Sequence, residues 1–161
     1  MKRRIFLGYG AGVLSLSGTK GGPNERPALG AVGVGGKGWA DSLGASRHGE
    51  IVAFCDVDQL GKDRKGGFVE AAKKWPKATR YTDWREMLEK EKLDGVTVST
   101  PDHMHAPVTM TALKLGISPY TQKPLTRTVH EARALTLAAR EAKVATQMGN
   151  QNHSGVNYKG L

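Results

Sequence analysis

A glycine-rich run at residues 33–38, with the sequence GVGGKG, constrains the fold of this chain more than any other feature. It ends an apolar stretch at 28–34 and fits the spacing G-x-G-x-x-G, and Asp56 closes the next apolar stretch about 20 residues further on. A segment with helical character, 38–47, lies between the two stretches. The order strand, glycines, helix, strand and acid predicts a dinucleotide-binding βαβ unit.

The glycines have separate physical roles in such a unit. Gly33 permits the tight turn out of the first strand, and Gly35 lets the backbone approach a pyrophosphate with no side chain in between. Gly38 lets the following helix pack closely on the strand, and the unpaired N–H groups of that helix face the anion. We therefore expect the whole run, with Gly36 and Lys37 included, to bind the cofactor.

Asp56 is expected to select the cofactor. Its carboxylate can accept hydrogen bonds from the adenosine ribose hydroxyls and would repel a 2′-phosphate, so the sequence favours NAD over NADP. The alternative for an acid at this place is a helix N-cap, and we assign that role to Asp58.

Strand and helix patterns alternate along the rest of the chain. Apolar, β-rich runs predict strands at 51–55, 95–99, 117–121 and 144–148, with a further short strand ending at Tyr81. Helical patterns connect them at 59–75, 83–90, 105–115 and 128–143. Gly66 and Gly67 fall inside the first of these helices. This alternation predicts an α/β fold with a doubly wound parallel sheet of the Rossmann type over residues 28–154.

Composition limits the classes of protein to which the chain can belong. Its 161 residues, with 39% hydrophobic and 24% charged side chains, suit one soluble globular domain. The net charge is +9, but part of it lies in the first 20 residues and the other basic residues are interleaved with acids, so we expect no nucleic-acid partner. Cys55 is the only cysteine and lies in an apolar run, which predicts a buried, inert thiol.

The N-terminal segment is predicted to be an export signal. Arg3 and Arg4 precede a modestly apolar, glycine- and serine-rich stretch, as in twin-arginine (Tat) signals, which direct folded proteins across the bacterial inner membrane. We expect residues 1–27 to be signal and linker and the mature protein to be periplasmic. The alternative is a basic N-terminus on a cytoplasmic protein. The apolar stretch is shorter than the about 20 residues that a membrane-spanning helix needs.

Further motifs follow the later strands. They are Cys55-Asp56-Val57-Asp58, Tyr81-Thr82-Asp83, Thr100-Pro101 with His105, and Lys123-Pro124-Leu125. Together with the glycine run, these motifs resemble the Gfo/Idh/MocA family, named after glucose–fructose oxidoreductase, inositol dehydrogenase and a rhizopine-catabolism protein. The resemblance covers residues 28–154 and implies the nucleotide-binding Rossmann domain of an NAD(P)-dependent oxidoreductase.

The resemblance also implies roles for residues at the later strand ends. Thr100 and Pro101 would line the dinucleotide, with His103 and His105 close by. Lys123 would be the catalytic residue that reaches the reacting carbon beside the nicotinamide. Gln122 would also contact the cofactor region, and it replaces the family's common glutamate, which leaves the protonation state of Lys123 open.

Lysine and histidine chemistry is consistent with these roles. A lysine held at a strand end can stabilise a developing alkoxide or share its proton while hydride leaves the substrate carbon. The pair His103 and His105 has a spacing that zinc sites use, but no cysteine or carboxylate cluster accompanies it. We therefore expect no metal site.

The chain is expected to be the cofactor-binding half of an oxidoreductase. Family members commonly carry a second, α+β domain that covers the nicotinamide, supplies the substrate contacts and forms the oligomer contact. We expect 155–161 to be the start of a truncated version of that region, and oligomers only where it is present. The expected reaction is hydride transfer between a sugar or cyclitol hydroxyl and NAD, incomplete in this chain alone. The alternatives are a non-catalytic NAD-binding regulator and a relative of NAD-dependent glycosidases.

Overall fold

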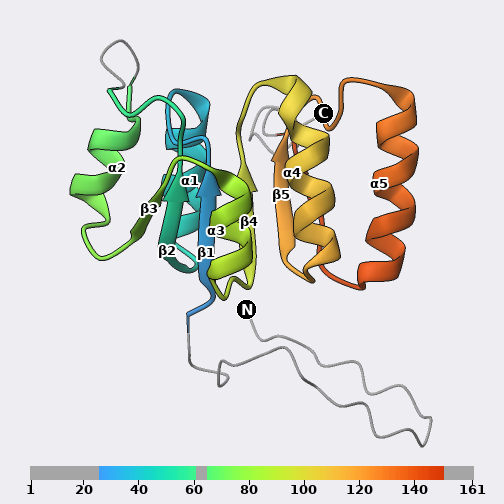
Figure 1. Cartoon of the computed structure of the whole chain (residues 1–161), viewed down its shortest axis with the longest axis horizontal. Coiled ribbons are helices and arrows are strands. Elements are labelled where there is room, and N and C mark those ends of the chain that lie inside the picture. Colours follow the sequence, from blue (N-terminus) through green and yellow to red (C-terminus); the bar gives the residue numbers. More distant parts are fainter. Residues whose placement is uncertain (1–25, 61–64, 151–161) are drawn as a thin grey trace, which may run out of the picture.

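Six parallel strands form one sheet in the computed structural model, which describes residues 26–60 and 65–150 (Figure 1). The strands are β1 (Ala28–Val32), β2 (Glu50–Cys55), β3 (Thr79–Tyr81), β4 (Gly95–Val98), β5 (Ser118–Gln122) and β6 (Gln147–Gly149). The helices are α1 (Lys37–Ser46), α2 (Phe68–Lys74), α3 (Trp84–Lys90), α4 (Asp102–Lys114) and α5 (Val129–Ala142). The predicted export signal lies outside the described residues.

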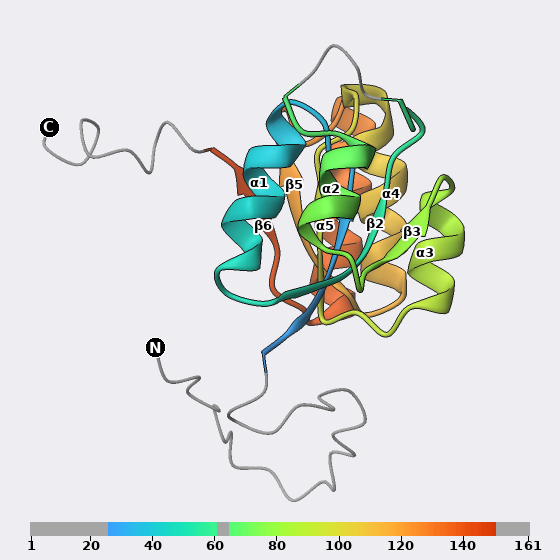
Figure 2. The ribbon, with the colours of Figure 1, turned by 90° about the vertical axis from the view of Figure 1, so that its left-hand side faces the viewer.

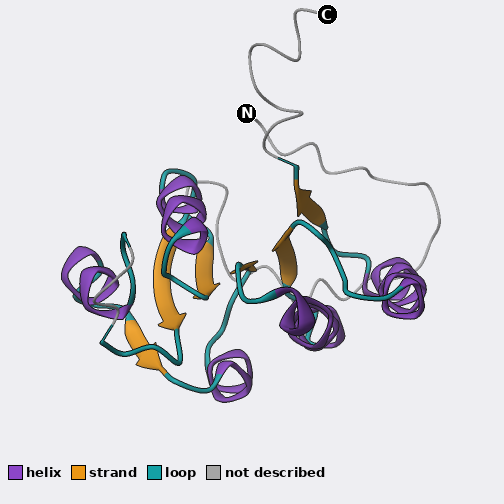
Figure 3. Ribbon diagram, turned by 90° about the horizontal axis from the view of Figure 1, so that it is seen from above, coloured by secondary structure: helices purple, strands orange, loops and turns teal. Residues whose placement is uncertain are grey.

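The strand order is β3-β2-β1-β4-β5-β6, so the direction of winding reverses between β1 and β4. Helices α1 and α2 cover one face of the sheet, and α3, α4 and α5 cover the other (Figure 3). This arrangement confirms the predicted doubly wound parallel sheet. In such a sheet, ligands bind where the order reverses, at the carboxyl ends of the strands.

Each face of the sheet has its own buried core. The core under α3 and α4 contains the aliphatic side chains of the central strands together with Met87, Leu88, Val108 and Ala112 of these helices. The core under α1 and α2 is built on Phe54 of β2, which packs edge-on against Phe68 with ring centroids 5.2 Å apart. Strands buried on both faces read as continuous apolar runs, which is why the sequence located β1, β2 and β4 closely.

The predicted helix at 59–75 is wrong in its extent. Helix α2 begins only at Phe68, directly after Gly66 and Gly67, whose φ angles of +83° and +96° are incompatible with a right-handed helix. Asp58 is accordingly not the N-cap of this helix; its Oδ1 accepts the N–H of Leu60 at 3.2 Å. The glycines end a connecting segment and do not interrupt a helix.

The other helices agree more closely with the prediction. Asp83 caps α3 and accepts the N–H of Arg85. Helix α4 begins at Asp102, three residues earlier than predicted, so His103 and His105 lie within its first turns. Thr128 caps α5 through a capping box with Glu131, whose pKa is lowered mainly by its hydrogen bond with the Thr128 backbone. Strand β6 is shorter than expected and ends at Gly149.

Candidate dinucleotide-binding site

A crevice of about 580 Å³ lies at the carboxyl ends of β1, β2 and β4. Its walls include Gly33, Gly35, Asp56, Thr100 and His103, all of them predicted cofactor-binding residues. The turn after β1 and the segment before α2 lie at this same end of the sheet (Figure 2). The structure therefore brings residues from three separate motifs around one cavity.

The glycine turn at 33–38 has the geometry that its spacing predicts. Gly33 has φ +80°, and a Cβ there would lie 2.5 Å from the Ser99 carbonyl oxygen, so only glycine fits. A Cβ on Gly38 would overlap the Gly33 carbonyl, which shows how closely α1 packs against the end of β1. Gly36, with φ +56°, forms the N-cap of α1, and a Cβ there would meet no atom within 4 Å. The turn is thus close-packed toward the sheet and open at the start of the helix.

The backbone of this turn is held by the segment before α2. Gly36 donates its N–H to the Lys65 carbonyl at 2.9 Å, and Gly67 donates to the Val34 carbonyl at 2.9 Å. Among the described residues, no carbonyl accepts the N–H of Gly35 or of Lys37. These two N–H groups are the donors of the turn that remain for an anion at the start of α1.

Asp56 connects the turn to the crevice. Its Oδ2 accepts the N–H of Val34 at 2.9 Å and its Oδ1 accepts the N–H of Asp58 at 3.0 Å. The residue is nevertheless partly exposed and lines the crevice. The carboxylate is therefore fixed in place while keeping the lone pairs that hydroxyl groups need.

The two histidines of α4 differ in their environment. His103 is exposed and lines the crevice. His105 is 1% exposed and does not line it; its ring nitrogens lie 2.8 Å from the Thr100 carbonyl and 2.6 Å from the Pro124 carbonyl. His105 is therefore a buried residue behind the crevice, where it joins the backbones of the two loops that carry Thr100 and Lys123. No group of three or more metal-ligating side chains occurs among the described residues.

Thr100 and Pro101 form the loop between β4 and α4, at the wall of the crevice. The Oγ1 of Thr100 is buried and has no hydrogen-bond partner among the described residues. A buried hydroxyl without a partner is uncommon in proteins, and a bound ligand or water ordinarily satisfies it. The loop therefore contributes a buried, unpartnered hydroxyl beside the crevice.

Lys123 and Gln122 lie at the end of β5, outside the crevice lining. Lys123 is exposed, whereas Gln122 is buried and donates from Nε2 to Asp41 Oδ2 at 2.9 Å. Asp41 was not among the residues predicted from the sequence. Its spacing of four residues from Lys37, with which it pairs at 2.6 Å, is the one local signal that could have found it.

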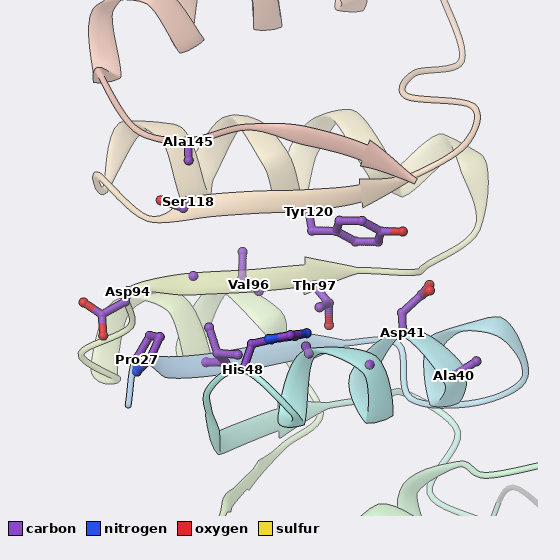
Figure 4. A pocket seen from close by; sticks show the side chains of 14 residues that line it. Pro27, Ala40, Asp41, His48, Asp94, Val96, Thr97, Ser118, Tyr120 and Ala145 are labelled. Carbon is purple, nitrogen blue, oxygen red and sulfur yellow. The ribbon is translucent and has the colours of Figure 1, made fainter. Parts of the chain in front are cut away.

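A second cavity of about 580 Å³ lies between α1 and the face of β4 and β5 (Figure 4). Asp41, Thr97 and Tyr120 line it from α1, β4 and β5. Burial raises the pKa of Tyr120, and Asp41 raises it further, whereas Lys37 acts in the opposite direction. Parallel sheets are ordinarily covered on both faces. Helix α1 therefore covers this part of the sheet face incompletely, and the residues of the turn at 33–38 do not line the cavity.

The family comparison identifies the class of domain. The family model GFO_IDH_MocA, described as "Oxidoreductase family, NAD-binding Rossmann fold", matches residues 29–150. An alpha-N-acetylgalactosaminidase from Shewanella oneidensis is 30% identical over 136 residues, which is 80% of this chain and 29% of that protein. This chain therefore spans less than a third of the length of that curated relative.

Solved structures show the same fold. The myo-inositol 2-dehydrogenase from Lactobacillus plantarum superposes with a TM-score of 0.75 at 19% identity, over 84% of this chain and 39% of that one. The WlbA dehydrogenase from Chromobacterium violaceum, in complex with NADH and UDP-GlcNAcA, superposes with a TM-score of 0.73 at 20% identity, over 84% of this chain and 38% of that one. No helix of the described residues is long and apolar enough to cross a membrane.

Proposed function

The chain belongs to the Gfo/Idh/MocA oxidoreductase family, as its NAD-binding Rossmann domain, and on this basis we propose that it binds NAD in the crevice at the ends of β1, β2 and β4. We propose further that this domain serves hydride transfer between a sugar or cyclitol hydroxyl and this cofactor, a reaction that we expect to be incomplete in this chain alone. The observation that carries the proposal is the glycine turn held by the Asp56 carboxylate at the point where the sheet reverses.

The crevice offers a binding group for each part of the dinucleotide. The pyrophosphate would lie at the start of α1, where the N–H groups of Gly35 and Lys37 are available. The adenosine ribose would lie against Asp56 in the crevice that Thr100, Pro101 and His103 also line.

The charges around the crevice support NAD over NADP. Three carboxylates, those of Asp56, Asp58 and Asp83, line it and would repel a 2′-phosphate. Arg85 also lines the crevice, but its Nη1 pairs with Asp83 at 3.3 Å, and its Cζ lies over the Trp84 ring at 4.6 Å from the ring centre. A 2′-phosphate would have to compete with Asp83 for that cation.

Lys123 is the proposed catalytic residue. NAD supplies the hydride acceptor when it is bound; the chain supplies a cation near the reacting hydroxyl. An ammonium at the end of β5 would stabilise negative charge on the substrate oxygen and hold or release its proton. The neighbouring Gln122 is held by its hydrogen bond to Asp41, and this contact restrains the backbone that carries Lys123.

A second reaction is favoured by one observation, the identity of 30% with an alpha-N-acetylgalactosaminidase. In this alternative the same cofactor site would serve glycoside cleavage without net production of NADH. Incubation of the protein with NAD and panels of polyols and aryl glycosides distinguishes the two. Absorbance growing at 340 nm supports the dehydrogenase, and release of the aryl group without such growth supports the glycosidase.

Lys123→Met is the variant that tests the catalytic proposal. It is expected to bind NAD as the wild type does, because the lysine lies outside the crevice lining. It is expected to lose the turnover that the wild type shows, because the cation beside the reacting hydroxyl is removed. Lys114→Met, a change of the same kind in the last turn of α4, is the matched control and should retain both properties. Full turnover in Lys123→Met would refute the role of the lysine.

We also propose that residues 1–27 direct Tat export to the periplasm, on the strength of Arg3 and Arg4. A reporter fused after residue 27 should be exported in wild-type cells. It should stay in the cytoplasm when both arginines are replaced by lysine. Equal export of the two reporters would contradict the proposal.

A further inference from the structure

Asp41 is a buried carboxylate to which three different parts of the site are bonded. The residue is 9% exposed and projects from the second turn of α1. Lys37 Nζ lies 2.6 Å from Oδ1, and Oδ2 accepts hydrogen bonds from Ser99 Oγ at 2.8 Å and from Gln122 Nε2 at 2.9 Å. These donors come from the glycine turn, the end of β4 and the end of β5, so one side chain joins all three.

The contact fixes the orientation of the Gln122 amide. Its Nε2 faces Asp41, and its Oε1 accepts the backbone N–H of Lys123 at 3.3 Å. A flipped amide would place oxygen against the carboxylate and a donor against the N–H, and both contacts would be repulsive. The position of the Lys123 backbone is therefore tied through Gln122 to α1.

Strand β6 closes the surroundings of this amide. A Cβ on Gly149 would lie 2.5 Å from Gln122 Nε2 and 3.0 Å from the Tyr120 hydroxyl, so there is no room for a side chain. The ionisable groups that face Asp41 are Lys37 on its own helix and Tyr120 on β5. Of these, Lys37 is the cation that compensates the buried carboxylate.

The geometry admits one carboxylate at this place. A glutamate at position 122 would bring a second carboxylate oxygen to within about 3 Å of Asp41 Oδ2, and like charges at that distance cannot both ionise without a large cost. An amide opposite a carboxylate satisfies both groups, whichever strand or helix carries the charge. The identities of residues 41 and 122 are therefore coupled.

We infer that Asp41 is a positioning residue of the proposed NAD site, and that Asp41 and Gln122 form a matched pair in which α1 or β5 carries the carboxylate, but not both. The inference rests on the proposed function for the meaning of the site. The role of this pair is to fix the start of α1, where the pyrophosphate would lie, relative to the end of β5 that carries Lys123.

The test compares Asp41→Asn, Gln122→Glu and the exchanged double variant with the wild type by thermal unfolding without ligand. Each single variant should unfold at a lower temperature, because Asp41→Asn removes the carboxylate that pairs with Lys37 and Gln122→Glu sets carboxylate against carboxylate. The double variant should recover at least half of the decrease in unfolding temperature summed over the two single variants, since it restores one carboxylate opposite one amide. Glu70→Gln, which removes an exposed carboxylate of α2, is the control and should leave the midpoint unchanged.

The pH dependence separates this pairing from general disruption. In Gln122→Glu the paired carboxylates have a raised folded-state pKa, so the folded state is favoured while they share a proton and loses stability as pH rises through that pKa. The difference in unfolding midpoint between the wild type and Gln122→Glu should therefore increase from pH 5 to pH 8. The same difference should stay nearly constant for Asp41→Asn. Strictly additive losses, or a gap in Gln122→Glu that does not change with pH, would overturn the matched pair.

NAD affinity provides the functional readout. Each single variant should weaken binding about fivefold or more, within the range of couplings in one hydrogen-bond network, and the double variant should restore most of it. Unaltered NAD affinity in folded single variants would overturn the positioning role. If the wild type itself binds no NAD, the proposed function fails, while the ligand-free unfolding cycle and its pH profile still decide the matched pair.

Discussion

Two glycines of the same helix are expected to respond in opposite ways to the same substitution. Gly38 and Gly44 both lie in α1. A Cβ at Gly38 would overlap the Gly33 carbonyl oxygen, lie 2.8 Å from its carbon and lie 3.1 Å from the Ser99 Cβ, whereas a Cβ at Gly44 would meet no atom within 4 Å. Gly38→Ala therefore tests the close packing of α1 on β1, and Gly44→Ala is its internal control.

The structure sets the size of the difference. The obstacle at Gly38 is main chain, so α1 must move away from β1; overpacking of this kind costs about 3 kcal/mol, from which the better helix propensity of alanine recovers about 1 kcal/mol. Gly44→Ala has no such cost, so the better helix propensity of alanine alone raises the free energy of unfolding by about 0.5–1 kcal/mol. The two variants should thus differ by about 3 kcal/mol, or about 10 °C in unfolding midpoint for a domain of this size.

Thermal unfolding followed by circular dichroism, together with NAD titration, measures both effects. Gly38→Ala should unfold below the wild type and bind NAD weakly, because the start of α1 is displaced from the turn. Gly44→Ala should unfold a few degrees above the wild type. Midpoints that shift together, or a Gly38→Ala protein as stable as the wild type, would show that α1 does not pack on β1 as described.

Three further outcomes are expected from the site and the core. Asp56→Ala should weaken NAD binding about tenfold or more and reduce the ratio of NAD affinity to NADP affinity, since the carboxylate that would bind the ribose and repel a 2′-phosphate is lost. Calorimetry with both cofactors measures this ratio, and an unchanged ratio would contradict the role of Asp56. Burial, followed by Asp56 and Asp83, raises the pKa of Cys55 to about 12, so a thiol reagent at pH 8 should label it only after unfolding in guanidinium; rapid labelling of the folded protein would place the thiol at the surface. Burial and the hydrogen bond to Glu91 raise the pKa of Tyr81 to about 12. The contribution of Tyr81 to the free energy of unfolding should therefore be complete below about pH 10 and lost as pH rises through 12. Tyr81→Phe should remove this loss of stability at alkaline pH, together with the tyrosinate absorbance at 295 nm that appears at the highest pH.

Much of the fold was accessible from the sequence because its signals are local. The run at 33–38 and the acid after β2 are short-range patterns, and buried parallel strands are continuous apolar runs. The start of α2 was missed because a helical pattern on either side of Gly66 and Gly67 outweighed their backbone preference. The structure shows these glycines at positive φ, where the chain turns to reach the loop after β1.

The parts of the site that the sequence missed depend on distant contacts. Asp41 bonds to Ser99 and Gln122, which lie 58 and 81 residues away, and no periodicity connects residues at such separations. The resemblance places His105 close to the dinucleotide but does not indicate its burial. That burial depends on α4 beginning at Asp102, which directs the ring toward the Thr100 and Pro124 carbonyls.

Isothermal titration calorimetry of the purified chain with NAD, with NADP and with NAD added to Gly35→Val tests the central claim most directly. Gly35 lines the crevice, and its N–H is one of the two donors left for a pyrophosphate, so a valine side chain would obstruct the approach of the phosphates. The account predicts saturable binding of NAD at one site per chain, weaker binding of NADP, and loss of NAD binding in a Gly35→Val protein that still unfolds cooperatively. Absence of heat from both cofactors, or equal NAD affinity in Gly35→Val, would contradict it.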